Sequence, residues 1–287
     1  MASAFKPPRV DRHTGGGRLQ RTVVETCLAQ VLPNAVEVAG GSTDAAQVHQ
    51  LRIGLRRLRT ALRELGGVAE GIAPGWENTL ADAFRRLGAW QDPQNLAQKM
   101  QPALRAAGGP EVDLAATGAG GEPPGDVVRT PALQAVLASL AGFVATEGAV
   151  GLEARHVRAL VGRRLDKLHR QVVQDGRRFA TLAPEAQHRV RKRLKRLRYL
   201  AEFTAPLFGS KHAGAFLGQL KPAQDALGRY NDEAVALAAY TNAAAVDPRA
   251  WFAIGWLAAR RPAGAEACRR ALHVLSRVQV FWPAASS

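Results

Sequence analysis

The same pattern of basic and apolar residues occurs twice in this chain, and this repeat constrains the fold more than any other feature. The segment VHQLRIGLRRLR (48–59) is matched at an offset of 139 residues by QHRVRKRLKRLR (187–198). A second pair of segments, LGAWQD (87–92) and LGRYND (227–232), is matched at an offset of 140 residues. Two matches at nearly one offset indicate two structural units of the same kind. We therefore expect two units related by an approximate two-fold axis.

Apolar residues recur at helical spacing along most of the chain, whereas the alternation typical of strands is nearly absent. Pro, Gly and Asn residues separate the periodic segments, for example at Pro33-Asn34 and Gly66-Gly67. These patterns predict an all-α fold of two helical bundles. The expected helices span residues 17–32, 44–66, 75–90, 93–107, 131–147, 152–176, 184–207, 211–228, 231–246, 249–261 and 264–278.

A segment rich in glycine and proline, GGPEVDLAATGAGGEPPGD (108–126), lies between the two units. Its glycines and prolines do not nucleate a helix, and it holds little to bury, so we expect a linker. The expected organisation is a flexible N-terminus at 1–16, a first repeat at 17–107, a linker at 108–128 and a second repeat at 129–280, with 17–280 forming one domain.

Each copy of the repeated helix has an apolar face and a basic face. At 100° per residue, the apolar side chains of each copy gather in one stripe and the basic side chains gather opposite to it. The expected core faces are Leu51, Leu55, Leu58 and Leu62 in the first copy and Val190, Leu194, Leu197 and Ala201 in the second. The expected basic rows are His49, Arg52, Arg56, Arg59 and Arg63 in the first copy and His188, Arg191, Lys195 and Arg198 in the second.

Neither basic row contains an acidic residue, over residues 49–63 or over 188–198. Like charges four residues apart destabilise a helix by about 0.2–0.5 kcal/mol each. A solvated face therefore usually interleaves Glu with Lys. Two equivalent helices without such acids favour an external anion, and the guanidinium of Arg binds phosphate oxygens bidentately. Each row extends over about 15–21 Å at 1.5 Å per residue, which is the reach of a chain of phosphates.

Several other polar residues are candidates for supporting roles. His49 and His188 lack the spacing of metal ligands, which leaves a hydrogen-bonded histidine at a helix start or a phosphate contact as alternatives. Lys221 is expected to support the site. Asp92 and Asp232 end the second pair of matched segments and are expected to cap a helix or pair with an arginine, not to catalyse a reaction. We expect no catalytic residue, metal or cofactor.

The overall charge also indicates an anionic partner. The chain has 39 Lys and Arg against 24 Asp and Glu, a formal net charge of +15, and self-repulsion of this size destabilises a compact state unless an anion offsets it. Cys27 and Cys268, far apart in the chain, are expected to lie in the core of a protein from a reducing compartment. We see no secretory signal, and no apolar run reaches the roughly 18 residues of a membrane helix. We therefore expect a soluble cytoplasmic protein.

The paired His-x-x-Arg segments, HRVRKRLKRLRYLAE and the two LG-x-x-x-D segments resemble the CHAD family, the conserved histidine α-helical domain, over about residues 17–280. The resemblance implies two four-helix bundles with pseudo-two-fold symmetry and a basic central surface or channel. It also implies binding of inorganic polyphosphate, association with polyphosphate granules and contact with granule-associated proteins. Some members are fused to a triphosphate-hydrolysing domain with an ExExK signature, which this chain lacks.

The resemblance and the charge pattern together define the expected binding site. The family's basic positions fall on His49, Arg52, Arg56, Arg57, Arg59, His188, Arg191, Lys195, Arg196 and Arg198. The charge pattern adds Arg63, Lys192 and Lys221.

Nucleic-acid binding and phosphoryl-transfer catalysis are the two alternatives to polyphosphate binding. A sequence-nonspecific nucleic-acid binder would suit the charge equally well, but the chain shows no helix-turn-helix, zinc-finger or RNP signature and its basic rows lack aromatics for base stacking. A phosphohydrolase or kinase would need Mg²⁺ ligands or a P-loop, and the basic rows supply neither. We therefore expect a binding protein and not an enzyme.

Overall fold

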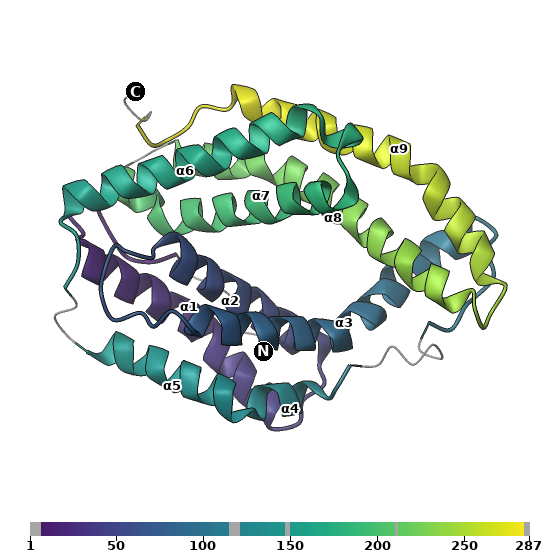
Figure 1. The fold of residues 1–287 in the computed structure, drawn as a ribbon, viewed down its shortest axis with the longest axis horizontal. Helices are drawn as coiled ribbons and strands as arrows, with labels where there is room; N and C mark the ends of the chain where they lie inside the picture. Colours follow the sequence, from purple (N-terminus) through teal and green to yellow (C-terminus); the bar gives the residue numbers. More distant parts are fainter. Residues whose placement is uncertain (1–6, 115–120, 147–149, 210–211, 284–287) are drawn as a thin grey trace.

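The computed structural model describes residues 7–114, 121–146, 150–209 and 212–283. The described residues form an all-α fold, with one isolated β-bridge between Ala69 and Gly151 (Figure 1). Short 3₁₀ turns follow α6, α7 and α9. The α-helices are α1 (Gly16–Ala39), α2 (Ala45–Glu64), α3 (Trp76–Ala106), α4 (Pro124–Arg129), α5 (Pro131–Ala145), α6 (Ala154–Arg177), α7 (Pro184–Thr204), α8 (Ala213–Ala243) and α9 (Ala250–Val274).

Helices pack mainly against neighbours from the same half of the chain. In the first half, α1 packs against α2, α4 and α5, and α3 packs against α2, α4 and α5. In the second half, α6 packs against α7 and α9, and α8 packs against α7 and α9. The two halves meet where α2 contacts α7 and α3 contacts α8 (Figure 1). The helices that carry the repeated segments are therefore the ones that join the halves.

The predicted core faces of the repeated helices are confirmed. Each of the eight predicted side chains is at most 6% exposed, and those of the second copy are fully buried. The Asp44 carboxylate caps the start of α2 by accepting a hydrogen bond from the Ala46 backbone N–H at 2.8 Å. Pro184 occupies the first turn of α7, where its missing N–H leaves no helical bond unmade. The buried apolar stripe and the positions of the two helix N-termini determine the direction in which the basic side chains of α2 and α7 point.

The core is continuous across the two halves. One cluster of buried apolar residues contains side chains from α1 to α8 and the C-terminal part of α9, and both Cys27 and Cys268 belong to it, as predicted. A second cluster lies where the later turns of α3 and α8 meet the first half of α9. Val112 and Leu114, 3% and 6% exposed, pack in this second cluster.

The expectation that the glycine-rich segment has little to bury and forms no helix is therefore wrong for its described residues. Val112 and Leu114 are buried, and α4 begins at Pro124. Residues 115–120 lie outside the described residues. The domain boundaries and the flexible N-terminus stay predictions, and residues 1–6 of that N-terminus also lie outside the described residues.

Several helix ends predicted from proline or asparagine are wrong. The helices that continue through expected breaks are α1 at Pro33, α3 at Pro93, α8 between residues 228 and 231, and α9 at Pro262. A proline inside a helix removes one hydrogen bond and costs about 3 kcal/mol. Burial of one aliphatic side chain contributes about 1.5–3 kcal/mol, and buried residues lie on both sides of Pro33, for example Val31 and Ala35. Packing against the core therefore outweighs the local cost. The expected start at residue 211 is outside the described residues.

Two ion pairs connect α2 and α7 in a reciprocal manner. Arg57 of α2 pairs with Glu202 of α7 at 3.0 Å, and Arg196 of α7 pairs with Glu64 of α2. Arg57 and Arg196 occupy equivalent positions of the repeat. The side chains of Arg57, Glu202 and Glu64 are only 10%, 14% and 7% exposed. The two arginines are thus equivalent, whereas Glu64 and Glu202 differ by 138 residues and lie one position away from equivalence.

Within the described ranges, none of the helices is both long enough and apolar enough to cross a membrane.

Candidate anion-binding site

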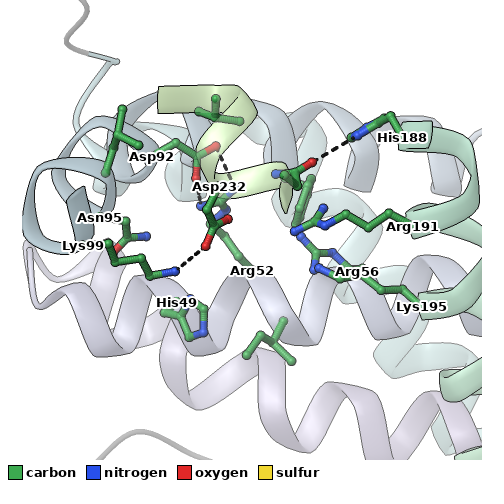
Figure 2. A pocket seen from close by; sticks show the side chains of 15 residues that line it. His49, Arg52, Arg56, Asp92, Asn95, Lys99, His188, Arg191, Lys195 and Asp232 are labelled. Carbon is green, nitrogen blue, oxygen red and sulfur yellow. Dashed lines mark hydrogen bonds and ion pairs between the residues drawn. The ribbon is translucent and has the colours of Figure 1, made fainter. Parts of the chain in front are cut away.

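A cleft of about 330 Å³ lies among α2, α3, α7 and α8 (Figure 2). Five Arg or Lys side chains and two histidines line it, against two carboxylates, so cations predominate. The lining residues are His49, Arg52, Ile53, Arg56, Phe84, Asp92, Asn95, Leu96, Lys99, His188, Arg191, Lys195, Asn231, Asp232 and Val235.

Equivalent residues of the two repeats face the same cleft. The pairs are His49 with His188, Arg52 with Arg191, Arg56 with Lys195, and Asp92 with Asp232. Figure 2 shows the side chains of Arg56, Arg191 and Lys195 reaching from two helices toward one another. The repeat thus concentrates charge from two distant parts of the chain at one site.

Three of the cleft's cations have no acidic counterpart. Among the residues that the structure describes, no carboxylate lies within ion-pair distance of Arg56, Arg191 or Lys195. Arg56 lies over the ring of Phe84, with 4.7 Å between its guanidinium carbon and the ring centroid. A cation–π contact of this kind orients the side chain without neutralising it. None of the three is therefore neutralised by a carboxylate in the described structure, and their nitrogen atoms face the cleft as potential hydrogen-bond donors to an anion.

The other two cations of the cleft are held by carboxylates. Arg52 donates to Asp92 at 2.6 Å and to Gln91 at 2.8 Å, which confirms the prediction that Asp92 pairs with an arginine. Gly88, from the first LG segment, leaves the room for this pair, because a Cβ there would lie 2.8 Å from Nη2 of Arg52. Asp232 instead accepts from Lys99 at 2.9 Å (Figure 2).

The pKa values of the cleft show that the cations are crowded. Burial, together with repulsion from Arg56 and Arg191, lowers the pKa of Lys195 to about 6. Burial and neighbouring cations also lower the pKa values of His49 and His188 below the usual value for histidine. Because a pKa lowered in this way reports that the charged form is unfavourable, a bound anion would raise all three.

The structure brings together six of the thirteen predicted site residues: His49, Arg52, Arg56, His188, Arg191 and Lys195. Seven lie outside the cleft: Arg57, Arg59, Arg63, Lys192, Arg196, Arg198 and Lys221. Most of the seven are neutralised by acids from neighbouring segments. Arg59 and Arg63 share Glu77 of α3, and Lys221 pairs with Asp225 one turn further along α8.

The other predicted residues outside the cleft have different surroundings. Arg57 and Arg196 form the buried pairs between α2 and α7, and Arg198 donates to Glu202 and Gln224. Lys192 is exposed on α7. The acidic partners of Arg57 and Arg196 come from the other helix of the α2–α7 contact, which a helical wheel cannot show, whereas Glu202 lies one turn from Arg198 on α7 itself.

Sequence reasoning missed Lys99, Phe84, Asn95 and Asn231. Asn231 accepts a hydrogen bond at 3.3 Å from Nδ1 of His188, in the tautomer that carries a proton there. The sequence did contain a signal for Asn231, because this residue directly precedes Asp232 in the second matched segment. Lys99 and Phe84 are not matched by a residue of the same type in the second copy, so the repeat gave no signal for either of them.

The chemistry that these groups offer is the binding of an anion. The side chains of Arg, Lys and His converge, while no cluster of three or more His, Cys, Asp or Glu residues suited to a metal occurs in the described part of the chain. The fold and the cleft together define an all-α domain with a candidate anion-binding cleft.

The chain belongs to the CHAD domain family, whose model matches residues 22–241. The fold is similar to the crystal structure of the CHAD domain from the plant Ricinus communis, at 24% identity and a TM-score of 0.74 over 95% of this chain and 96% of that chain. It is also similar to PptA from Streptomyces chartreusis, at 18% identity and a TM-score of 0.62 over 95% and 100%. No curated protein matches. At these identities the likeness to solved structures concerns the fold.

Proposed function

We propose that the protein binds inorganic polyphosphate in this cleft and does so without catalysing a reaction. The observation that carries the proposal is the convergence of Arg56, Arg191 and Lys195, none with an acidic partner in the described structure. A polyphosphate chain offers closely spaced negative charges along its length, so it can satisfy cations from both repeats at once. Binding to such a chain would place the protein on polyphosphate granules in the cytoplasm, where granule-associated proteins are further candidate partners.

An approximate two-fold relation between the repeats supports a chain as the ligand. We infer this relation from the reciprocal Arg57–Glu202 and Arg196–Glu64 pairs and from the matched residues that line the cleft. A polyphosphate chain has the same chemical structure in both directions, so a site with two equivalent walls suits such a ligand. A single small anion would use one wall only.

Nucleic acid is the rival ligand, and the cleft favours polyphosphate. Phe84, the one Phe, Tyr or Trp among the described residues that line it, lies under the guanidinium groups of Arg52 and Arg56, at 5.1 and 4.7 Å from the ring centroid. It is therefore not available for stacking on a base, which single-stranded nucleic-acid sites use. A volume of about 330 Å³ also suits a bare phosphate chain better than a duplex.

The proposal is tested by titrating the protein with polyphosphates of several lengths at several salt concentrations. Release of condensed counterions makes affinity fall with salt by roughly 0.7 log units per decade for each engaged cation. Five engaged Arg and Lys residues predict a slope of about −3 to −4. Displacement of polyphosphate by duplex DNA or RNA at equal phosphate concentration, or phosphate release with Mg²⁺ or Mn²⁺ present, would overturn the proposal.

Polyphosphate binding is expected to take up protons, mainly on Lys195. Its pKa of about 6 leaves the amine largely neutral at pH 7.5 in the free protein, and a phosphate oxygen beside it raises that pKa. Affinity should therefore fall as pH rises above about 6, and binding at pH 7.5 should take up about one proton. Calorimetry in buffers of different ionisation enthalpy measures this uptake. The Lys195→Arg variant keeps its charge at this pH and should lose most of the uptake; equal uptake in both proteins would contradict the assignment.

A further inference from the structure

A second, smaller cavity of about 80 Å³ adjoins the main cleft. His188, Arg191 and Asn231 line both spaces, so the cleft and the smaller cavity meet at these three side chains. The remaining lining comes from the 3₁₀ turn Phe179–Thr181, from the start of α7, from α8 and from α9. It consists of Phe179, Pro184, Gln187, Leu227, Tyr230, Ala234 and Arg261.

Arg261 of α9 supplies the cation on the far side of the smaller cavity. Its guanidinium lies over the Tyr230 ring at 4.7 Å and donates one hydrogen bond to the Tyr230 hydroxyl at 2.8 Å. That hydroxyl donates to Gln187 at 3.0 Å, so Arg261 is held in place by a chain of polar contacts. No ion pair to Arg261 occurs among the described residues, and four of its five N–H donors are not used by Tyr230.

Arg191, which lines both the cleft and the smaller cavity, also lacks an ion pair among the described residues. It is largely buried and has no carboxylate within ion-pair distance in the described structure, because Asp232 pairs with Lys99 instead. Arg191 and Arg261 therefore present two unneutralised guanidinium groups to one small cavity that opens beside the cleft.

We propose that the smaller cavity is a subsite that receives phosphates extending out of the cleft, with Arg261 as their outer contact. This inference rests on the proposed polyphosphate binding and adds a direction to it: the chain leaves the cleft past His188 and Arg191 toward α9. The volume is sufficient for a phosphate group. The ligand at this subsite is thus the continuing or terminal phosphate of the same chain.

The test compares Arg261→Gln with the unchanged protein, using tripolyphosphate and long-chain polyphosphate as the two probes. Long-chain affinity should fall about fivefold to tenfold, and the salt slope should become shallower by roughly 0.7, the contribution of one cation. Tripolyphosphate, which the main cleft accommodates alone, should bind with unchanged affinity. Arg261→Lys should recover most of the long-chain affinity, because the charge is retained.

The neighbouring Arg260 offers a matched control. It pairs with Glu233 at 3.1 Å, lies over the Trp256 ring at 4.4 Å and lines neither cavity, so Arg260→Gln should leave both affinities unchanged. Equal loss for both probes would show that Arg261 acts only through the shape of the cleft, and no loss for either would show that the chain does not pass it. Both results overturn the subsite. If the unchanged protein bound neither tripolyphosphate nor long-chain polyphosphate, the proposed function itself would be overturned.

Discussion

The Lys195→Glu variant is expected to lose at least about two orders of magnitude in affinity for long-chain polyphosphate. A hydrogen bond to a charged group contributes about 1.5–3 kcal/mol, and tenfold in affinity corresponds to 1.4 kcal/mol. The substitution removes one such contact and adds a carboxylate facing the ligand, so both effects act in the same direction. Arg56→Glu, on the opposite wall, should act in the same way. Binding is measured by the salt-controlled titration described above.

Loss of binding in Lys195→Glu should not come from unfolding. In the free protein, Lys195 stands among Arg56 and Arg191, and a glutamate there would pair with them and relieve their repulsion. We therefore expect an unchanged or higher melting temperature without ligand, as is usual when a residue serving a binding site is replaced. A lower affinity for polyphosphate together with an unchanged or higher melting temperature would distinguish a binding role of Lys195 from a structural role.

Lys167→Glu and Arg163→Glu are the matched controls. Both residues are exposed on α6 and line neither cavity. Arg163→Glu changes the net charge by the same amount as Arg56→Glu, and Lys167→Glu changes it by at least as much as Lys195→Glu. They should weaken binding only slightly, through the long-range field of the protein. If they weaken it as much as Lys195→Glu and Arg56→Glu do, total charge and not the cleft determines binding.

The Glu202→Gln variant is expected to lower the free energy of unfolding by about 3 kcal/mol or more. Arg57 is 10% exposed and pairs with Glu202 at 3.0 Å, so removal of the carboxylate takes away the negative charge that Glu202 supplies beside a buried guanidinium. Breaking a buried ion pair from one side typically costs 3–5 kcal/mol. A chain of this size should lose several degrees of melting temperature as a result. Denaturant titration and thermal unfolding measure the two quantities.

An exposed ion pair gives the comparison for this effect. Glu122 pairs with Arg86 at the surface, with side chains 38% and 31% exposed, and Glu122→Gln should change stability by less than about 1 kcal/mol. Similar losses in Glu122→Gln and Glu202→Gln would mean that the contact between α2 and α7 contributes no more than a surface pair. Polyphosphate affinity measured well below the unfolding transition should be retained in Glu202→Gln, because Glu202 does not line the cleft.

The periodicity of the sequence predicted the core faces of α2 and α7 correctly, because burial of an apolar stripe is a local pattern that any packing partner must satisfy. It failed at Pro33, Pro93 and Pro262, where each helix continues. A proline signals a local cost, whereas the energy that keeps these helices intact comes from residues brought against them by the tertiary fold. The glycine-rich segment was misread for the same reason at Val112 and Leu114.

By itself, the sequence determined that this protein is helical and duplicated and that it carries two equivalent cationic helices. These properties follow from spacing along one chain. Only the tertiary structure decided which cations stay unneutralised. Arg59 lies on the same basic row as Arg56, but Glu77 of α3 pairs with Arg59 and no carboxylate of the described residues pairs with Arg56. Arg196 directly follows Lys195 in the sequence, but Glu64 of α2 pairs with Arg196 and not with Lys195. Electrostatic pairing acts through space over a few ångströms, so it depends on neighbours that periodicity along a helix cannot reveal.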